Sequence, residues 1–336
     1  LLYVSCFPQL IAGPIVQYSD VAKQIGSRKT TAKDFTRGMQ RFVVGLGKKV
    51  IFANICGLIL RDLPLADAGA MSFGGAWYAG FVYMLQVYFD FSGYSDMAIG
   101  IGRILGFTYK ENFDYPFIAK DVSEYWHRWH ISLSTWFRDY LLYPILRSRG
   151  MRRLSMKKSE RHGRMYYRNL ATMIATTCVW AFTGLWHGAS WNFIVWGLYF
   201  CVLQLLEKFA LGRVREKLPA IARWAINLIL IVVSFVIFYY TDMGLVTRHI
   251  SAMLGVGSTG FIDARSRLVI RTYSFFPLLA FVCSMPIAPM LNRLGRGLLG
   301  SKAFEIVKSV ALSACVALAV LFLVGQSYNP FIYFQF

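Results

Sequence analysis

Acidic residues are scarce in this sequence. Asp and Glu contribute 17 of the 336 residues against 36 Lys and Arg, and charged residues of all kinds make up only 16% of the chain. Hydrophobic residues make up 56%, and the mean hydropathy is +0.46. So little charge and so much apolar surface exclude an ordinary soluble globular protein. The composition therefore predicts a membrane protein.

The net charge of +19 has two explanations, which are nucleic-acid binding and membrane topology. The basic side chains gather in loops between apolar runs, mainly in 147–168, 207–223 and 293–302. Because cytoplasmic loops collect Lys and Arg, we expect these three loops in the cytoplasm and no nucleic-acid partner. The loop 241–272 falls outside by helix counting yet carries four arginines. It is therefore re-entrant, or one helix is miscounted.

Cysteine patterns and common catalytic motifs are also missing. The six cysteines are scattered and never form C-x-x-C, which leaves no basis for a disulfide framework or a zinc site. The chain has no H-E-x-x-H and no G-x-S-x-G, its glycines at 100–106 have the wrong spacing for a dinucleotide loop, and Gly47-Lys-Lys lacks the hydroxyl of a P-loop. We expect neither a metal nor a bound cofactor.

Long apolar runs are abundant, and a run of about 20 such residues can span a bilayer. The clearest candidates are 76–91, 170–187, 190–206, 224–240, 273–290 and 306–325, and the less certain ones are 1–13, 42–60 and 93–107. The segment 42–60 is uncertain because Lys48 and Lys49 interrupt it. We expect seven to nine membrane elements, and a start inside an apolar segment without Met suggests that upstream helices are missing.

Residues 120–141 form a different pattern. Apolar and aromatic side chains from Val122 to Tyr140 repeat at helical spacing, and Asp121 with Glu124 resembles a capping box. The charged residues lie on the opposite face. The pattern predicts one amphipathic helix at the cytoplasmic interface or beneath the helix bundle.

Polar residues interrupt the apolar run near residue 90. Two carboxylates, a serine and a tyrosine stand close together there: Asp90, Ser92, Tyr94 and Asp96. Ionisable groups inside a membrane are candidates for function, but we favour a buried hydrogen-bonded cluster that holds helices together, with Arg103 closing it, because buried polar groups need partners whatever their function.

A histidine ends one apolar run just before the next begins. His187 follows Trp186 and precedes Asn192, with glycines at 184 and 188. If its helix starts near Asn169 at the cytoplasmic face, His187 lies about 27 Å along the axis, in the outer half of the membrane. The alternative is an interfacial histidine beside a belt of tryptophans.

Two further histidines stand in the amphipathic segment. By helical angle His130 borders the apolar stripe, whereas His127 lies toward the polar face and water. A structural hydrogen bond and a catalytic role remain equally open for His130. Two histidines on apolar elements without a metal-ligand pattern suit proton transfer, and a hydroxyl attacking an acyl group needs such a base. The residues point to acyl transfer.

Five motifs together resemble the membrane-bound O-acyltransferase family, in its bacterial alginate O-acetyltransferase branch. They are residues 7–14 (FPQLIAGP), 88–97 (YFDFSGYSDM), 129–140 (WHISLSTWFRDY), 184–188 (GLWHG) and 330–336 (PFIYFQF). The resemblance implies an all-α, polytopic membrane fold with a central tunnel and interfacial amphipathic helices. Residues 1–336 would be a single membrane domain that lacks its N-terminal helices.

The resemblance also implies roles for the histidines. It makes His187 the essential catalytic residue and His130 its second histidine, while Asp90, Ser92, Tyr94, Asp96, Trp186 and Asn192 would shape the tunnel wall or a structural polar cluster. The donor would be acetyl-CoA or another cytoplasmic thioester, drawn to the basic loop through Arg152, Arg153, Lys157 and Lys158. Two departures stand out: His127 replaces the usual arginine of W-R-R-W-H, and residues 238–242 (FYYTD) lack the arginine of F-R-A-D.

The expected setting is a bacterial inner membrane. The expected partners are membrane lipid, a polysaccharide acceptor such as alginate, and a periplasmic or extracellular acetyltransferase of the SGNH esterase type. D-alanyl transfer to teichoic acid from a carrier protein is the alternative within the family. A secondary transporter is the alternative from another class, but no repeated halves are visible.

Overall fold

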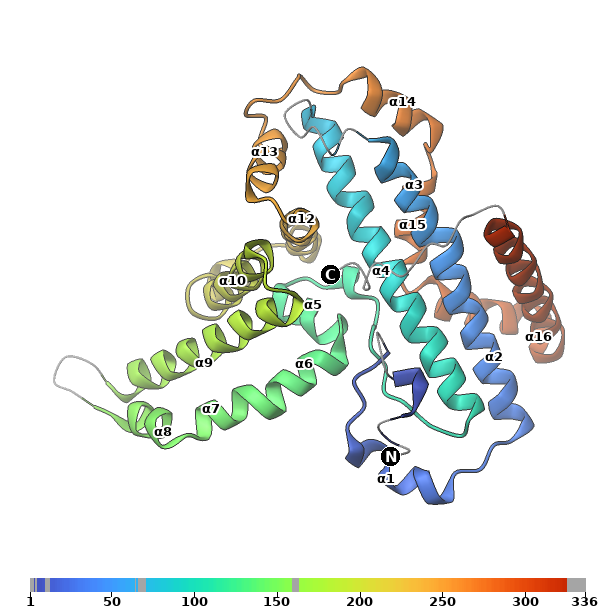
Figure 1. Cartoon of the computed structure of the whole chain (residues 1–336), viewed down its shortest axis with the longest axis horizontal. Helices are drawn as coiled ribbons and strands as arrows, with labels where there is room; N and C mark the ends of the chain where they lie inside the picture. The colour runs from blue at the N-terminus through green and yellow to red at the C-terminus, as the bar shows by residue number, and fades with distance from the viewer. Residues whose placement is uncertain are drawn as a thin grey trace. The chain divides into compact units, whose positions relative to one another are not determined.

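The computed structural model describes residues 3, 5–9, 13–63, 65, 71–158 and 163–324 (Figure 1). Within these ranges the chain is helical and contains no strand, which confirms the all-α expectation. The motif at 330–336, residues 10–12 of the motif at 7–14, and part of the basic loop, 159–162, lie outside the described residues.

The chain forms two compact units. One unit holds residues 1–117 and 248–336, and the other holds residues 118–247. The prediction of a single membrane domain stays a prediction. The helices of the first unit are η1 (Phe7–Gln9), α1 (Tyr18–Ser27), α2 (Ala32–Gly47), η2 (Lys48–Ala53), α3 (Asn54–Asp62), α4 (Phe73–Ile104), η4 (Pro116–Ile118, at the boundary), α14 (Ala264–Thr272), α15 (Phe276–Cys283) and α16 (Ile287–Val324); α13 (Met243–Met253) contains the other boundary.

The helices of the second unit follow in chain order. They are α5 (Val122–Arg128), α6 (Ile131–Phe137), η5 (Arg138–Leu142), α7 (Tyr143–Arg147), α8 (Arg149–Met156), α9 (Arg164–His187), α10 (Trp191–Leu206), η6 (Glu207–Leu211), α11 (Gly212–Glu216) and α12 (Ala220–Tyr239). In this unit α9 packs along both α8 and α10, and α10 also packs against α12 (Figure 1).

In the first unit, α2 and α4 run side by side at very short distance (Figure 1). A Cβ atom added to Gly45 of α2 would lie only 2.5 Å from the carbonyl oxygen of Gly93 in α4. Only a residue without a side chain permits this approach, as is common where membrane helices pack closely. The segments α2, η2 and α3 form one helical run, Ala32–Asp62, so the uncertain span 42–60 is helical throughout.

Four helical segments in the described part of the chain are long and apolar enough to cross a membrane: Ala32–Asp62, Trp191–Leu211, Ala220–Tyr239 and Ile287–Val324. The pair Ala264–Thr272 and Phe276–Cys283, bent by 60°, makes a fifth if it is one broken span. This is fewer than the seven to nine elements expected. The candidates 76–91 and 93–107 lie mostly within the single helix α4. Neither α4 nor α9 is among the four segments, because polar residues lower the mean hydropathy of both helices.

The amphipathic segment is two helices rather than one. Trp129 leaves the helical conformation after α5, and His130 has left-handed backbone angles, φ 46° and ψ 52°, before α6 begins. The start of α5 differs from a capping box in one bond. Asp121 accepts a hydrogen bond from the Glu124 amide (2.7 Å), but the Glu124 carboxylate accepts from the Lys120 amide (2.9 Å) rather than from the amide of Asp121. The expected aromatic stripe is buried at Trp126 and Trp129.

Candidate active site

His187 is the last residue of α9, and the next residue turns the chain sharply. Gly188 has φ 155° and ψ 166°, a conformation that is essentially restricted to glycine. A Cβ atom there would also lie 2.7 Å from the Phe193 ring. Gly188 therefore allows α9 to stop at His187 and α10 to begin four residues later, at Trp191.

Aromatic rings surround the His187 imidazole. The Trp196 ring lies 4.9 Å from it at 85° and the Phe238 ring 5.2 Å from it at 87°, both measured between ring centroids. Trp186 lies at 4.9 Å and Phe193 at 6.3 Å. Within the described ranges no hydrogen bond to His187 is present, and the contacts given for its imidazole there are with aromatic rings.

The second histidine lies beside the first. His130 is buried, and its ring centroid is 6.0 Å from that of Trp186. Trp186 thus contacts both imidazoles, and the two histidines are close enough to interact electrostatically. The structure therefore brings together His187, His130 and Trp186, which the sequence analysis selected separately.

Asn192 joins the two helices that supply the ring walls. It is fully buried in the first turn of α10, and its Nδ2 donates a hydrogen bond to the Phe238 carbonyl oxygen at the end of α12 (3.2 Å). That carbonyl is one of the last four of the helix, which lack partners within the helix. Asn192, predicted as part of a polar cluster or tunnel wall, thus connects the start of α10 to the end of α12.

A cavity of about 340 Å³ lies among α5, α6, α9 and α10. Its walls include Ile131, the residue after His130, and Thr183, one helical turn before His187. His127 and Arg138 also line it, so the exposed His127 faces this cavity mouth. A second cavity of about 340 Å³ shares Ser123, Thr176 and Gln204 with the first and adds Glu207, Lys208 and Arg215. The two cavities thus share part of their walls in the second unit.

Glu207 lines the second cavity. Its carboxylate accepts hydrogen bonds from the amides of Val122 (2.9 Å) and Ser123 (3.3 Å), because the first amides of α5 have no partners within the helix and favour an anion. Arg215 lies 3.2 Å from the same carboxylate and 3.5 Å from that of Asp121. These contacts tie η6 and α11 to the start of α5.

The four predicted basic donor residues have a different location. Arg152 and Arg153 are exposed on α8, and Lys157 and Lys158 are exposed just after it. None of them lines either cavity; the basic residues that do are Arg138, Lys208 and Arg215. The sequence analysis counted these three as ordinary loop or surface charges.

The polar cluster of α4 belongs to the first unit. Asp90 pairs with Lys49 inside the helix packing, and Asp96 pairs with Arg41 (2.7 Å) and Lys48 (2.7 Å). We expected Arg103 to close this cluster, but it pairs instead with Asp34 (3.1 Å). Ser92 is buried among the packed helices. The two carboxylates thus hold α4 to α2 and η2.

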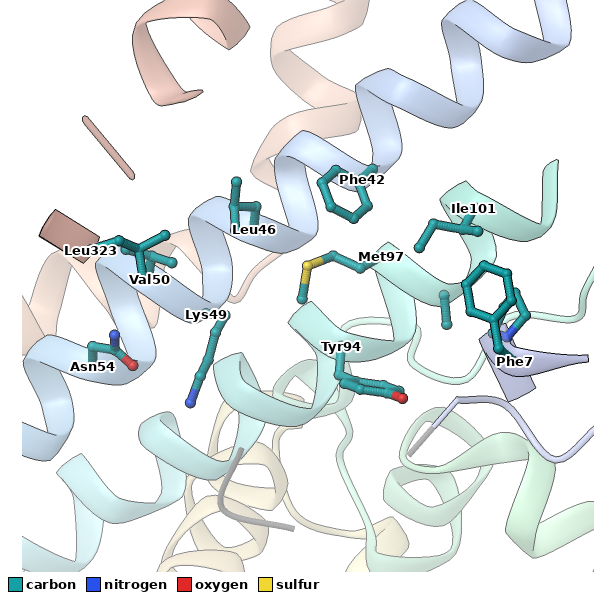
Figure 2. Close-up of a pocket in the computed structure, with 12 residues that line it drawn as sticks. Phe7, Phe42, Leu46, Lys49, Val50, Asn54, Tyr94, Met97, Ile101 and Leu323 are labelled. Carbon is teal, nitrogen blue, oxygen red and sulfur yellow. The ribbon is translucent and has the colours of Figure 1, made fainter. Parts of the chain in front are cut away.

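Tyr94 lines an apolar cavity of about 380 Å³ in the first unit. Figure 2 shows the side chains of Phe42 and Leu46 from α2 on one side and those of Tyr94, Met97 and Ile101 from α4 on the other. The site residues predicted together from sequence therefore divide, with the α4 cluster in one unit and both histidines in the other.

No group of three His, Cys, Asp or Glu side chains within the described part of the chain could hold a metal ion. The residues that the sequence analysis missed around His187 are Trp196 and Phe238. Phe238 begins the 238–242 stretch that was noted only for its lost arginine, so a signal for its importance was present.

Comparison with known proteins gives consistent matches. The family described as "membrane-bound O-acyltransferase family" matches residues 1–157. The chain is 34% identical to the probable alginate O-acetylase AlgI of Pseudomonas putida, over 99% of this chain and 68% of that protein. It is 29% identical to the peptidoglycan O-acetyltransferase of Helicobacter pylori, over 100% of this chain and 64% of that protein. It is 30% identical to the teichoic acid D-alanyltransferase of Bacillus subtilis, over 62% of this chain and 51% of that protein.

Proposed function

Because this chain belongs to the membrane-bound O-acyltransferase family and is a multi-pass membrane O-acyltransferase, we propose that it acetylates a cell-surface polysaccharide in a bacterial inner membrane. The donor in this proposal is a cytoplasmic thioester such as acetyl-CoA. Two of the similar proteins are named for O-acetyl transfer, to alginate and to peptidoglycan, which supports acetyl as the acyl group.

His187 is the general base in the proposed reaction. The imidazole takes the proton of the acceptor hydroxyl while the hydroxyl oxygen attacks the thioester carbonyl carbon. The carbon–sulfur bond then breaks, and the departing thiolate takes the proton back as a thiol. The observation that carries the proposal is the meeting of His187 and His130 at one tryptophan, beside a cavity whose walls include a neighbour of each.

The cavity supports a route for the thioester. Its lining combines apolar walls, which suit an aliphatic thioester arm, with hydroxyl and amide side chains from Ser123, Thr176 and Gln204 that can hydrogen-bond to amides. His130 orients the thioester or passes the proton in this scheme. The acceptor hydroxyl belongs to the polysaccharide or to an SGNH-type partner protein that completes the transfer outside the cell.

The test is His187→Ala in a deletion strain, with acetylation of the extracellular polysaccharide as the readout. General-base catalysis typically contributes about 10²- to 10⁴-fold, so we expect a loss of at least about 10²-fold. His249→Ala is the control, because His249 is buried and bonded to the Ala76 carbonyl (3.0 Å) in the other unit. More than about a tenth of wild-type activity in correctly inserted His187→Ala protein would falsify the base assignment.

D-alanyl transfer is the second candidate, and the similarity to a teichoic acid D-alanyltransferase over 62% of the chain favours it. It needs a carrier-protein thioester as donor. Purified protein incubated with labelled acetyl-CoA, and separately with a D-alanyl carrier protein, distinguishes the two by which label reaches the acceptor.

A further inference from the structure

Among the described residues, the His187 ring has no hydrogen-bonded partner that could orient it. Catalytic histidines are commonly held by a carboxylate or carbonyl that accepts a hydrogen bond from one ring nitrogen. Among the residues that the structure describes, none bonds to His187 in this way. Something else must fix the direction of its nitrogen lone pair if the ring is to meet a hydroxyl.

Two buried aromatic rings meet His187 at right angles. Trp196 comes from the second turn of α10 and Phe238 from the last turn of α12. Their centroids lie 4.9 and 5.2 Å from that of the imidazole, and the two rings lie 5.2 Å from each other. Edge-to-face contacts of this kind have a preferred geometry, unlike contacts with aliphatic side chains. The two rings therefore restrict rotation of the imidazole.

The position of Phe238 depends on Asn192. The Asn192 side-chain amide donates to the Phe238 carbonyl oxygen, and the next residue, Phe193, packs its ring 4.9 Å from that of Phe238. One polar contact and one ring contact thus fix the end of α12 against the start of α10. Loss of the amide would free the backbone that carries the Phe238 ring.

We propose that Trp196 and Phe238 are positioning residues that orient the His187 imidazole, and that Asn192 holds Phe238 in place for this purpose. The proposal rests on the proposed function in one respect, which is that His187 is the base. An alternative is that the three residues only fill the core. The positioning role predicts a loss of kcat in variants of these residues that are as stable as a control variant, whereas a role in core filling alone predicts no such loss.

The chain offers a matched control for Asn192. Asn227 is also buried, lies on α12 in the same unit, and donates its Nδ2 hydrogen bond to a backbone carbonyl, that of Ala119 (2.9 Å). Asn227 lies 11 residues before Phe238 on α12, and its bond reaches the segment before α5 rather than the end of α12. Asn192→Leu and Asn227→Leu therefore remove the same kind of bond at two places.

The experiment measures kinetics and histidine reactivity on purified full-chain protein. Phe238→Leu and Asn192→Leu should lower kcat at least tenfold with donor KM changed less than threefold, because small misplacements of a catalytic group are costly. Phe238→Tyr, which keeps the ring, should retain activity within threefold. Asn227→Leu should lower the Tm without this kcat loss.

Carbethoxylation of His187 by diethyl pyrocarbonate, measured by peptide mass spectrometry, gives a readout besides activity. Its rate should rise at least threefold in Phe238→Leu and Asn192→Leu, while that of the exposed His127 stays constant. Equal effects of Asn192→Leu and Asn227→Leu on kcat and on labelling would overturn the positioning role. Full activity of His187→Ala would instead overturn the proposed function, and the labelling rates would still report whether the rings restrain His187.

Discussion

At the scale of single residues, both histidines stand where the backbone leaves ordinary helical geometry. His130 has φ 46° between two helices, and His187 precedes a glycine with φ 155°. Histidine is one of the few residues besides glycine, Asn and Asp that is enriched at positive φ. The backbone at residue 130 thus limits which substitutions test its side chain alone.

His130→Asn is the informative variant, because asparagine tolerates the left-handed conformation and lacks the imidazole. We expect it to lower acyl transfer by at least about 10²-fold, as loss of a proton-transfer group does. His127→Arg should keep activity within a few-fold, since His127 is exposed and a surface change typically alters stability by about 0.5 kcal/mol or less. Transfer is measured on membranes with matched protein amounts.

His130→Gly separates the two contributions further. It relieves the backbone and removes the ring, so its activity should match that of His130→Asn. Equal losses in His127→Arg and His130→Asn would mean that both histidines take part in the reaction, and the assignment of His130 alone would then be wrong.

At the scale of helices, paired charges join α2 and η2 to α4. Lys49 and Asp90 are both buried and form an ion pair, while Lys48 and Arg41 flank Asp96. A π-helical segment, Lys48–Ala53, carries the two lysines at this point. Lys48 and Lys49 made the segment 42–60 uncertain as a membrane span, and carboxylates of α4 pair with both of them.

Removing one partner should cost more than removing both. Lys49→Met removes the ion-pair partner of the buried Asp90 carboxylate, and breaking a buried pair in this way typically costs about 3–5 kcal/mol, whereas replacement of both partners by apolar residues is often neutral. We expect a large fall in Tm for Lys49→Met and recovery of most of it in Lys49→Met with Asp90→Leu. Thermal unfolding in detergent provides the measurement.

The pair of Arg103 and Asp34 is the control for this comparison. Both side chains are partly exposed, at 42% and 32%, and such pairs contribute at most about 1 kcal/mol. Arg103→Gln should therefore change the Tm little. Additive losses from Lys49→Met and Asp90→Leu would show that the buried pair is not coupled.

At the scale of the whole molecule, the positive charge is unevenly distributed. The segment from Arg147 to Lys158 carries six basic residues and no acidic one, and four of them, Arg152, Arg153, Lys157 and Lys158, are the proposed donor-side charges. They are exposed and line neither of the two cavities in the unit that holds the histidines, so we expect them to act through long-range attraction of an anionic donor.

Neutralising these four residues to Gln should raise the donor KM several-fold and reduce its dependence on salt, because attraction between exposed charges is screened by ions. The value of kcat should stay within twofold. The matched control neutralises four exposed basic residues of the other unit: Lys23, Lys29, Lys33 and Arg37. Cysteine labelling from each side of the membrane verifies insertion, and an unchanged donor KM would leave these charges a role in topology only.

Sequence patterns predicted the helical class and both histidines, because apolar periodicity and rare polar residues are local signals. They failed where the outcome depended on distant partners. The break at His130 sets one residue in a left-handed conformation within an otherwise regular stripe, and periodicity cannot detect that. Arg41, Lys48 and Lys49 pair with carboxylates 41 to 55 positions later in the chain. Trp196 and Phe238 reach His187 only when three helices meet.

The paired charges between α2 and α4 also govern how the chain is made. Lys48 and Lys49 are synthesised before Asp90 and Asp96, so the helical run Ala32–Asp62 meets the translocon while its lysines have no carboxylate of α4 to neutralise them. A lysine at the centre of a helix typically costs about 2.5–3.5 kcal/mol on insertion. We therefore expect the helix to gain its stable place in the bilayer only after α4 has been made and packs against it.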